Sequence, residues 1–346
     1  PSRIQQGHAM SMLGEITEQA SVVERLLATG RKSIRGIADL MAGSTHVVIA
    51  ARGSSDNAAR YAQYVWGARN HLSVSLTTPS LFSLFDSPPA LTDALVVGIS
   101  QSGQSPDLVE VLEVAHKGGR PTIAITNDPA SPLADCADVV IDLCAGSETA
   151  VAATKTYTAQ LAAVAACSTA FDGESSDKLW DMPTILQEAL DVAKEATRAV
   201  DGLVDTDRCV VIGRGFHHAT VFEWALKLQE LTYILAQPFS GADFLHGPVA
   251  VVERGFPVVV VATAGPAYEQ MANLASDMME RGAHVVTATD VSGTPGSQVI
   301  QVAAVEPWLS PLVLAPVLQR FTHALSVARG QDPDRPRGLS KVTRTR

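Results

Sequence analysis

The segment 100–107 reads SQSGQSPD and brings three serines and a glycine together where an apolar run ends. Ser105 followed by Pro106 is typical of the N-cap and first position of a helix, which we expect to continue to Lys117. The first turn of a helix offers free N–H groups and the positive end of the helix dipole, and both favour an anion. A phosphate there could be surrounded by the hydroxyls of Ser100, Ser102 and Ser105. The alternative is a Ser/Gly-rich turn with one N-cap.

A similar loop, RGSSD at residues 52–56, follows an earlier apolar run. We expect Ser54 and Ser55 to add donors to the same anion, since ligands of open α/β sheets bind at the carboxyl ends of strands. Ser55 or Asp56 could instead cap the following helix, and the two roles do not exclude each other. Neither GxGxxG nor GxxxxGK[ST] occurs, which argues against a dinucleotide site or a P-loop.

Acid–base chemistry could come from residues 224–231, WALKLQEL, where Lys227 and Glu230 lie three positions apart on a predicted helix. Side chains at this spacing share a helix face, so the pair is either a solvated ion pair or part of a site. His246 lies in a predicted loop ending in Gly247-Pro248, where a histidine could be exposed, structural or functional. These segments alone leave the roles of all three residues open.

Two further segments carry titratable groups. The pair His217-His218 occurs without HExxH and without a third spaced histidine, so it is weak evidence for a metal, and we expect none. The tail, residues 331–346, has five Lys or Arg against two Asp. It either frays or folds back so that Lys341 reaches a phosphorylated ligand.

Composition limits the class of protein. The chain has 346 residues, enough for two domains, and its net charge of −10 argues against a dedicated nucleic-acid binder. Its four cysteines form no CxxC pair, which excludes a disulfide scaffold or a zinc ribbon. No apolar run reaches membrane-spanning length, and no secretory signal is visible in residues 1–16. We expect a cytoplasmic protein that binds neither nucleic acid nor membranes.

Short β-branched runs alternate with longer helical patterns, as in α/β proteins with a parallel sheet. Most of the runs are apolar without alternation, as expected when helices cover both faces of a sheet. They predict nine strands, at residues 47–51, 74–77, 95–100, 122–126, 139–143, 209–212, 257–262, 284–288 and 299–305.

Three stretches of the first half recur in the second half at a constant offset of 162 residues. They are 51–53 with 213–215, 97–103 with 259–265, and 122–128 with 284–290. We therefore predict two copies of one α/β unit, joined by a connector at 172–197 that contains an amphipathic helix. The serine-rich loop of the first copy has TAGPA as its counterpart, so the first copy is predicted to hold the ligand.

Seven segments occur in a specific order: RGSSDNA, ISQSGQSPD, AGSETAVAATKTYTAQL, GRGF, ALKLQE, FLHGPV and PRGLSKVT. In this order they resemble the sugar isomerase (SIS) domain family, over about residues 16–345. The resemblance is closest to double-SIS aminosugar-phosphate enzymes, namely SIS-type glucosamine-6-phosphate deaminases and the isomerase half of glutamine–fructose-6-phosphate aminotransferase. The glutaminase half of the aminotransferase needs a leading cysteine and is not expected here, because the first cysteine is Cys136.

The resemblance implies an α/β fold of two tandem SIS domains, each a flavodoxin-like or Rossmann-like parallel sheet flanked by helices. The implied domains are an N-terminal helical segment at 1–30, SIS domains at 31–171 and 198–330, the connector helix at 172–197, and a tail at 331–346 that closes the site.

The resemblance also implies roles for individual residues. The phosphate contacts fall on Ser100, Gln101, Ser102 and Ser105, with Ser54 and Ser55 nearby, while Val151, Ala152 and Ser340 belong to the sugar site. Glu230 matches the glutamate that moves a proton between C1 and C2, and Lys227 matches a lysine beside it. His246 matches a histidine that assists ring opening and comes from the other subunit of a homodimer. Lys341 matches the tail lysine that closes over the sugar.

Two positions depart from the aminotransferase pattern, because Gln104 and Gln229 stand where that enzyme has Glu and Lys; both could alter substrate preference. The expected activity converts glucosamine 6-phosphate to fructose 6-phosphate and ammonia, without cofactor or metal. A single carboxylate can move the proton, and a histidine titrates in the range that ring opening needs. The alternatives are a plain phosphosugar isomerase, a fructosamine-phosphate deglycase, and a non-catalytic phosphosugar sensor. Glu230, His246 and Lys341 argue against the sensor.

Overall fold

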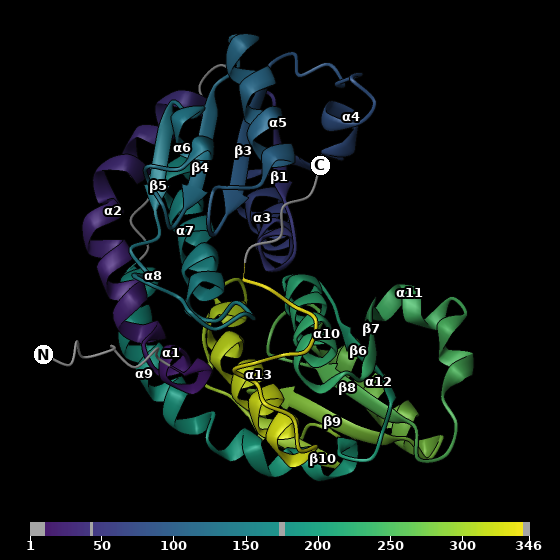
Figure 1. Cartoon of the computed structure of the whole chain (residues 1–346). Coiled ribbons are helices and arrows are strands. Elements are labelled where there is room, and N and C mark those ends of the chain that lie inside the picture. The colour runs from purple at the N-terminus through teal and green to yellow at the C-terminus, as the bar shows by residue number, and fades with distance from the viewer. Residues whose placement is uncertain (1–10, 42–43, 173–176, 342–346) are drawn as a thin grey trace, which may run out of the picture.

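The computed structural model describes residues 11–41, 44–172 and 177–341, which form two parallel sheets flanked by helices (Figure 1). The sheets have the strand orders β2-β1-β3-β4-β5 and β10-β9-β8-β6-β7. This confirms the predicted α/β class and the two tandem units. The strands are β1 (His46–Ala51), β2 (Ser73–Leu76), β3 (Ala94–Ser100), β4 (Thr122–Thr126), β5 (Val139–Asp142), β6 (Arg208–Gly213), β7 (Leu235–Ser240), β8 (Pro257–Val261), β9 (His284–Thr289) and β10 (Gln298–Gln301).

Helices precede, flank and connect the two sheets. Those of the first half are α1 (Met12–Thr17), α2 (Gln19–Met41), α3 (Ser54–Asn70), α4 (Ser80–Ser83), α5 (Pro106–Lys117), α6 (Pro132–Asp135) and α7 (Lys155–Asp172). The connection is made by α8 (Asp177–Trp180), α9 (Met182–Val192) and the 3-10 helix η1 (Glu195–Leu203). The second half has α10 (His217–Thr232), α11 (Gly241–Leu245), the 3-10 helix η2 (Pro248–Val251), α12 (Tyr268–Glu280) and α13 (Ser310–Ala328). Within these described ranges, no helix combines the length and apolar character needed to cross a membrane.

The helical layers explain the unbroken apolar runs of the strands. Every residue of β3 is buried, because helices cover both faces of the sheet. Val97 and Ile99 belong to the core beneath α2, α3 and α7, whereas Val96 packs on the other face with Leu108 and Leu112 of α5. Alternate residues of one strand therefore serve two different apolar layers.

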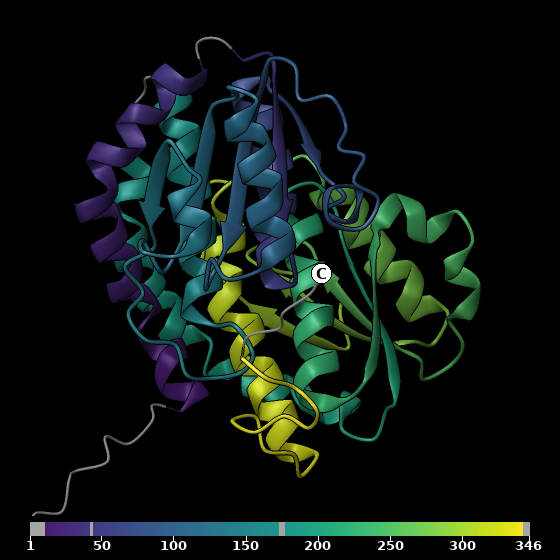
Figure 2. The same cartoon turned by 45° about the horizontal axis from the view of Figure 1, so that its top comes forward.

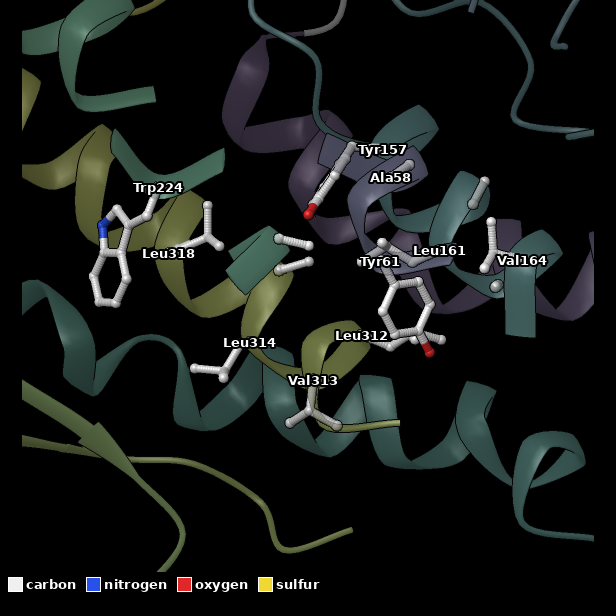
Figure 3. Packing of buried hydrophobic residues seen from close by; sticks show 14 of the residues in the cluster. Ala58, Tyr61, Tyr157, Leu161, Val164, Trp224, Leu312, Val313, Leu314 and Leu318 are labelled. Carbon is white, nitrogen blue, oxygen red and sulfur yellow. The ribbon is translucent and has the colours of Figure 1, made fainter. Parts of the chain in front are cut away.

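The two halves bury a common hydrophobic core. Ala58 and Tyr61 of α3, Leu161 of α7, Trp224 of α10 and Leu314 of α13 all belong to it (Figure 3). Figure 2 shows α13 running between the helices of the first half and those of the second. This shared core fixes the strand ends of the first unit against α10 of the second unit.

The 162-residue offset extends through most of the structure. The starts of β1 and β6, of β2 and β7, and of α5 and α12 are separated by this interval. The connector helix also forms, and Leu186 and Leu190 of α9 are buried. Helix α2 ends only at Met41, so it runs through the domain boundary predicted at residue 30.

The predicted strands differ from the observed ones in two places. Strand β7 was missed, because its sequence LAQPFS is not an apolar run and contains Pro238. Proline is tolerated there because β7 is an edge strand that pairs only with β6. Strand β10 ends at Gln301, four residues before the predicted end.

Candidate active site

A cavity of about 350 Å³ is lined by the loops after β1 and β3, helix α10 and the C-terminal tail. Eleven of the predicted residues line it: Ser54, Ser55, Ser100, Gln101, Ser102, Ser105, Val151, Lys227, Glu230, Ser340 and Lys341. Arg52, Glu148 and Leu339 also line it and were not among the predicted site residues. The cavity therefore combines side chains from both repeats with the tail.

The loop after β3 is fixed by its own hydroxyls. Ser100 Oγ accepts a hydrogen bond from Gly103 N at 3.1 Å, and Ser102 Oγ accepts one from Gln104 N at 3.3 Å. A hydroxyl that accepts can still donate its own hydrogen, so both remain able to bind an anion. Gly103 is required because its φ is +61° and a Cβ would lie 2.0 Å from Ser131 Oγ.

Helix α5 begins at Pro106 and ends at Lys117, as predicted. Ser105 occupies the N-cap position, but its side chain makes no capping hydrogen bond. Its hydroxyl lines the cavity instead. The first turn of α5 and the hydroxyls of Ser100, Ser102 and Ser105 thus border one space that can receive an anion.

The loop after β1 brings Ser54 and Ser55 to the cavity, as predicted, but neither serine caps α3. The N-cap of α3 is Gly53, with φ +55°, so capping by Ser55 or Asp56 is wrong. Ser54 Oγ donates to Glu223 Oε1 at 3.0 Å, and Ser55 Oγ accepts from Gln160 Nε2 at 2.9 Å. The Ser55 hydroxyl hydrogen is therefore available to a ligand, whereas the Ser54 hydrogen is directed to Glu223.

A cluster of charged side chains on α10 borders the cavity. Lys227 Nζ contacts Glu230 Oε2 at 2.5 Å and Glu223 Oε1 at 3.5 Å. Burial alone would lower the pKa of Lys227, but the two carboxylates outweigh it and hold this pKa well above its ordinary value, so the ammonium persists at neutral pH. Glu230 Oε1 has no hydrogen-bond partner among the described residues, so one carboxylate oxygen is held by Lys227 and the other can meet a substrate.

Glu223 was missed by sequence reasoning. It is fully buried, and Asn57 Nδ2 donates to its Oε2 at 2.8 Å. Burial raises the pKa of Glu223, and the attraction of Lys227 offsets only part of that rise. The only signal available was its position four residues before Lys227, one helical turn away.

Sequence reasoning also missed Glu148, although it lies within AGSETAVAATKTYTAQL, one of the segments that resemble the SIS family. Its carboxylate accepts hydrogen bonds from Thr154 N and Thr156 N, each at 3.0 Å, and pairs with Lys341. Burial raises the pKa of Glu148, but Lys341 and the two backbone amides outweigh this and lower it. Glu148 therefore holds the tail lysine against the cavity wall.

Two predicted site residues do not line the cavity. Ala152 is 1% exposed and belongs to the hydrophobic core, so its side chain does not line the cavity. His246 lies at the C-cap of α11, where its side chain is exposed. Figure 1 shows α11 at the outer side of the second unit, away from the first sheet. Within one chain, His246 does not join the other predicted residues.

The equivalent loop of the second unit encloses a hollow of only about 90 Å³. The buried imidazole of His217 contacts Thr263 Oγ1 at 2.6 Å and Ser310 Oγ at 3.0 Å. Burial lowers the pKa of His217 to about 3, so the ring is neutral and structural. In the part of the chain that the structure describes, no group of three or more His, Cys, Asp or Glu side chains could hold a metal ion.

The family model of the SIS domain matches residues 40–170 and 202–300 of this chain. The chain is 30% identical over 349 residues to glutamine–fructose-6-phosphate aminotransferase [isomerizing] of Thermococcus kodakarensis. That alignment covers 97% of this chain and 58% of the relative. The chain thus spans little more than half the length of this curated relative.

Solved structures share the fold along nearly the whole chain. A candidate phosphosugar isomerase from Silicibacter pomeroyi is 32% identical with a TM-score of 0.86, covering 93% of this chain and 99% of that one. The C-terminal domain of glucosamine-fructose-6-phosphate aminotransferase from Francisella tularensis is 25% identical with a TM-score of 0.86, covering 97% and 100%. Both similarities extend over the two units.

Proposed function

The chain belongs to the SIS domain family, and we propose that it converts glucosamine 6-phosphate to fructose 6-phosphate and ammonia. The observation that carries this proposal is the composition of one cavity. It joins a hydroxyl-lined loop suited to phosphate with the Lys227–Glu230 pair and a tail lysine. Relatives described as a phosphosugar isomerase and as an isomerizing aminotransferase support a hexose phosphate as the substrate class.

The phosphate would bind at the loop after β3, where Ser100, Ser102 and Ser105 can each donate a hydroxyl hydrogen. Because the phosphate does not react, its binding energy serves to fix the distance between the sugar carbons and Glu230. Substrates without the phosphate should therefore lose turnover as well as affinity.

Glu230 would be the acid–base group. In the open-chain aminosugar, its carboxylate removes the proton from C2 and returns it to C1. Lys227 holds Glu230 Oε2 at 2.5 Å and fixes which oxygen faces the sugar. A second proton passes from the amino nitrogen to the C1 oxygen, so the product has a hydroxyl on C1 and an imine at C2. Addition of water to the imine then releases ammonia and leaves the ketose.

The tail and a second subunit would complete the site. Lys341 brings positive charge over the open-chain sugar, where negative charge develops on oxygen during proton transfer. We further propose that the protein is a homodimer in which His246 of one copy assists ring opening in the other. The exposure of His246, and its absence from the cavity lining of its own chain, support this arrangement.

The activity is tested by following ammonia release and ketose formation in parallel over a panel of hexosamine 6-phosphates. We expect both products from glucosamine 6-phosphate in equal amounts. Ketose without ammonia from a non-aminated aldose phosphate would indicate a plain isomerase. Ammonia from neither glucosamine 6-phosphate nor its epimers, together with tight binding, would contradict the proposal and favour a sensor.

The shared site is tested by mixing two inactive variants, His246→Ala and Glu230→Gln, under conditions that allow subunit exchange. If the residues act across the dimer, a mixed dimer has one site with both groups intact, and part of the activity returns. If they act within one chain, every site stays damaged. An inactive mixture despite verified exchange, or a fully active monomer by light scattering, would remove the shared-site proposal.

A further inference from the structure

Phosphate recognition in the cavity requires positive charge as well as hydroxyls. A phosphate monoester carries roughly 1.5 to 2 negative charges at neutral pH, and serines supply none to balance it. Among the described residues, the cations that line the cavity are Arg52, Lys227 and Lys341. Lys227 Nζ lies between the carboxylates of Glu223 and Glu230, and Lys341 pairs with the buried carboxylate of Glu148. Arg52 is also paired, with Asp107, but its side chain is 49% exposed, against 1% for Lys227 and 23% for Lys341, so it is the cation most open to a ligand.

The sheet register brings Arg52 next to the phosphate loop. Ala51, the last residue of β1, pairs with Ile99 of β3. Arg52, directly after β1, and Ser100, the last residue of β3, therefore lie side by side. Both line the cavity, together with Ser102 and Ser105.

Asp107 holds the Arg52 guanidinium in this position. Arg52 Nε donates to Asp107 Oδ2 at 2.9 Å, and Nη2 lies 2.8 Å from the same oxygen. The Asp107 side chain is 1% exposed and lies in the first turn of α5, whereas the Arg52 side chain is 49% exposed. The pair therefore uses one edge of the guanidinium, and Nη1 has no hydrogen-bond partner among the described residues.

We propose that Arg52 binds the phosphate of the substrate through the free edge of its guanidinium, and that Asp107 positions it. This inference rests on the proposed phosphosugar function. The planar guanidinium can bond a carboxylate along one edge and a phosphate oxygen along another, which a lysine ammonium cannot do with the same geometry. A buried carboxylate at a helix N-terminus is a stable anchor, because the helix dipole favours its charge.

The second repeat provides a matched control. Arg214 follows β6 as Arg52 follows β1, with the same 162-residue offset. Its guanidinium contacts Gln270, a neutral side chain, and it borders the hollow of about 90 Å³ that His217 also lines. A cation there meets no hydroxyl-lined loop, so we expect Arg214 to make no contribution to phosphate binding.

The test is calorimetric titration of the full chain with inorganic phosphate, fructose 6-phosphate and unphosphorylated fructose. Arg52→Gln should raise the dissociation constant for fructose 6-phosphate about 10- to 100-fold, the loss expected for a hydrogen bond to a charged group. Arg52→Lys should give an intermediate loss, and Arg214→Gln should stay within about twofold of the wild type. In turnover, Arg52→Gln should raise KM and also lower kcat, because phosphate binding positions the sugar for proton transfer.

Arg52→Lys keeps a cation beside Asp107, so it carries the test if Arg52→Gln does not fold. Unchanged phosphate affinity in the Arg52 variants, or an equal loss in Arg214→Gln, would overturn the inference. A wild type that binds neither phosphate nor fructose 6-phosphate would overturn it together with the proposed function. Phosphate binding that depends on Arg52, with no ammonia or ketose from any substrate, would contradict only the proposed function.

Discussion

The two repeats share a backbone plan and differ in the loop that follows their third strand. Ser100, Ser102 and Ser105 of the first unit have alanines 162 residues later, at positions 262, 264 and 267. The first loop borders a cavity of about 350 Å³, whereas the second loop borders a hollow of about 90 Å³. The same strand–loop–helix arrangement therefore borders an open cavity in one copy and a packed junction in the other.

The difference extends to the loop after the first strand of each unit. Ser55 of the first unit corresponds to His217 of the second, again 162 residues later. The small serine leaves the cavity open, while the imidazole of His217 is buried against Thr263 and Ser310. A helix N-terminus at a strand end is thus not enough to make a site; the volume of the neighbouring side chain decides whether a ligand can enter.

The largest effect is expected from Glu230, which α10 of the second unit contributes to the cavity. Glu230→Gln removes the carboxylate but keeps its size, so proton exchange between C1 and C2 should fall by about 100-fold or more. Binding of the sugar phosphate should be retained. The measurement is incorporation of solvent deuterium by NMR, with Glu269→Gln, an exposed glutamate of α12, as the control. Near-wild-type exchange in Glu230→Gln would mean that another residue is the base.

A smaller effect is expected from the loop hydroxyls. Ser102→Ala should weaken phosphosugar binding by roughly 1–3 kcal/mol, because a charged oxygen loses its donor. The reciprocal variant Ala264→Ser adds the hydroxyl to the second loop and should create no binding, since His217 and Pro307 already border that hollow. Dissociation constants from calorimetry decide both cases. Equal affinities for wild type and Ser102→Ala would show that the hydroxyl is not used.

The smallest effect concerns stability and pH. Burial lowers the pKa of His217 from 6.5 to about 3 in the folded protein, so only the unfolded chain takes up this proton between those values. The stabilisation associated with the neutral ring is therefore complete above pH 6.5 and is lost as the pH falls toward 3.

His217→Gln removes this titration. Between pH 6.5 and about pH 5, the free energy of unfolding of the wild type should fall by about 1–2 kcal/mol more than that of His217→Gln. Urea denaturation at several pH values provides the measurement. If the free energies of unfolding of the two proteins changed in parallel with pH, His217 would titrate normally and would not fill the second loop.

The sequence predicted the parts of the molecule that depend on local pattern. Buried strands such as β3 appear as apolar runs, and α5 appears between its proline and the glycines that follow it. Strand β7 lacks an apolar run because it is a partly exposed edge strand. The repeat itself contained the missing signal, since residues 73–76 of β2 correspond to 235–238 at the same offset.

The residues that the sequence did not reveal act through distant partners. Glu148 pairs with Lys341, 193 positions later, and Glu223 bonds Asn57, 166 positions earlier. Neither contact leaves a spacing pattern along the chain, because it forms only when the two units and the tail pack together. Arg52 was visible in its loop, but its role depends on Asp107, a buried anchor 55 positions later.

A crystal structure with bound fructose 6-phosphate would show most directly where the phosphate binds. We predict one sugar phosphate per chain, with phosphate oxygens within hydrogen-bond distance of Ser100, Ser102 or Ser105 and with C1 and C2 facing Glu230. The loop at Thr263, Ala264 and Gly265 should remain empty. A phosphate seated at that second loop, or a sugar whose C1 and C2 lie away from Glu230, would contradict the account.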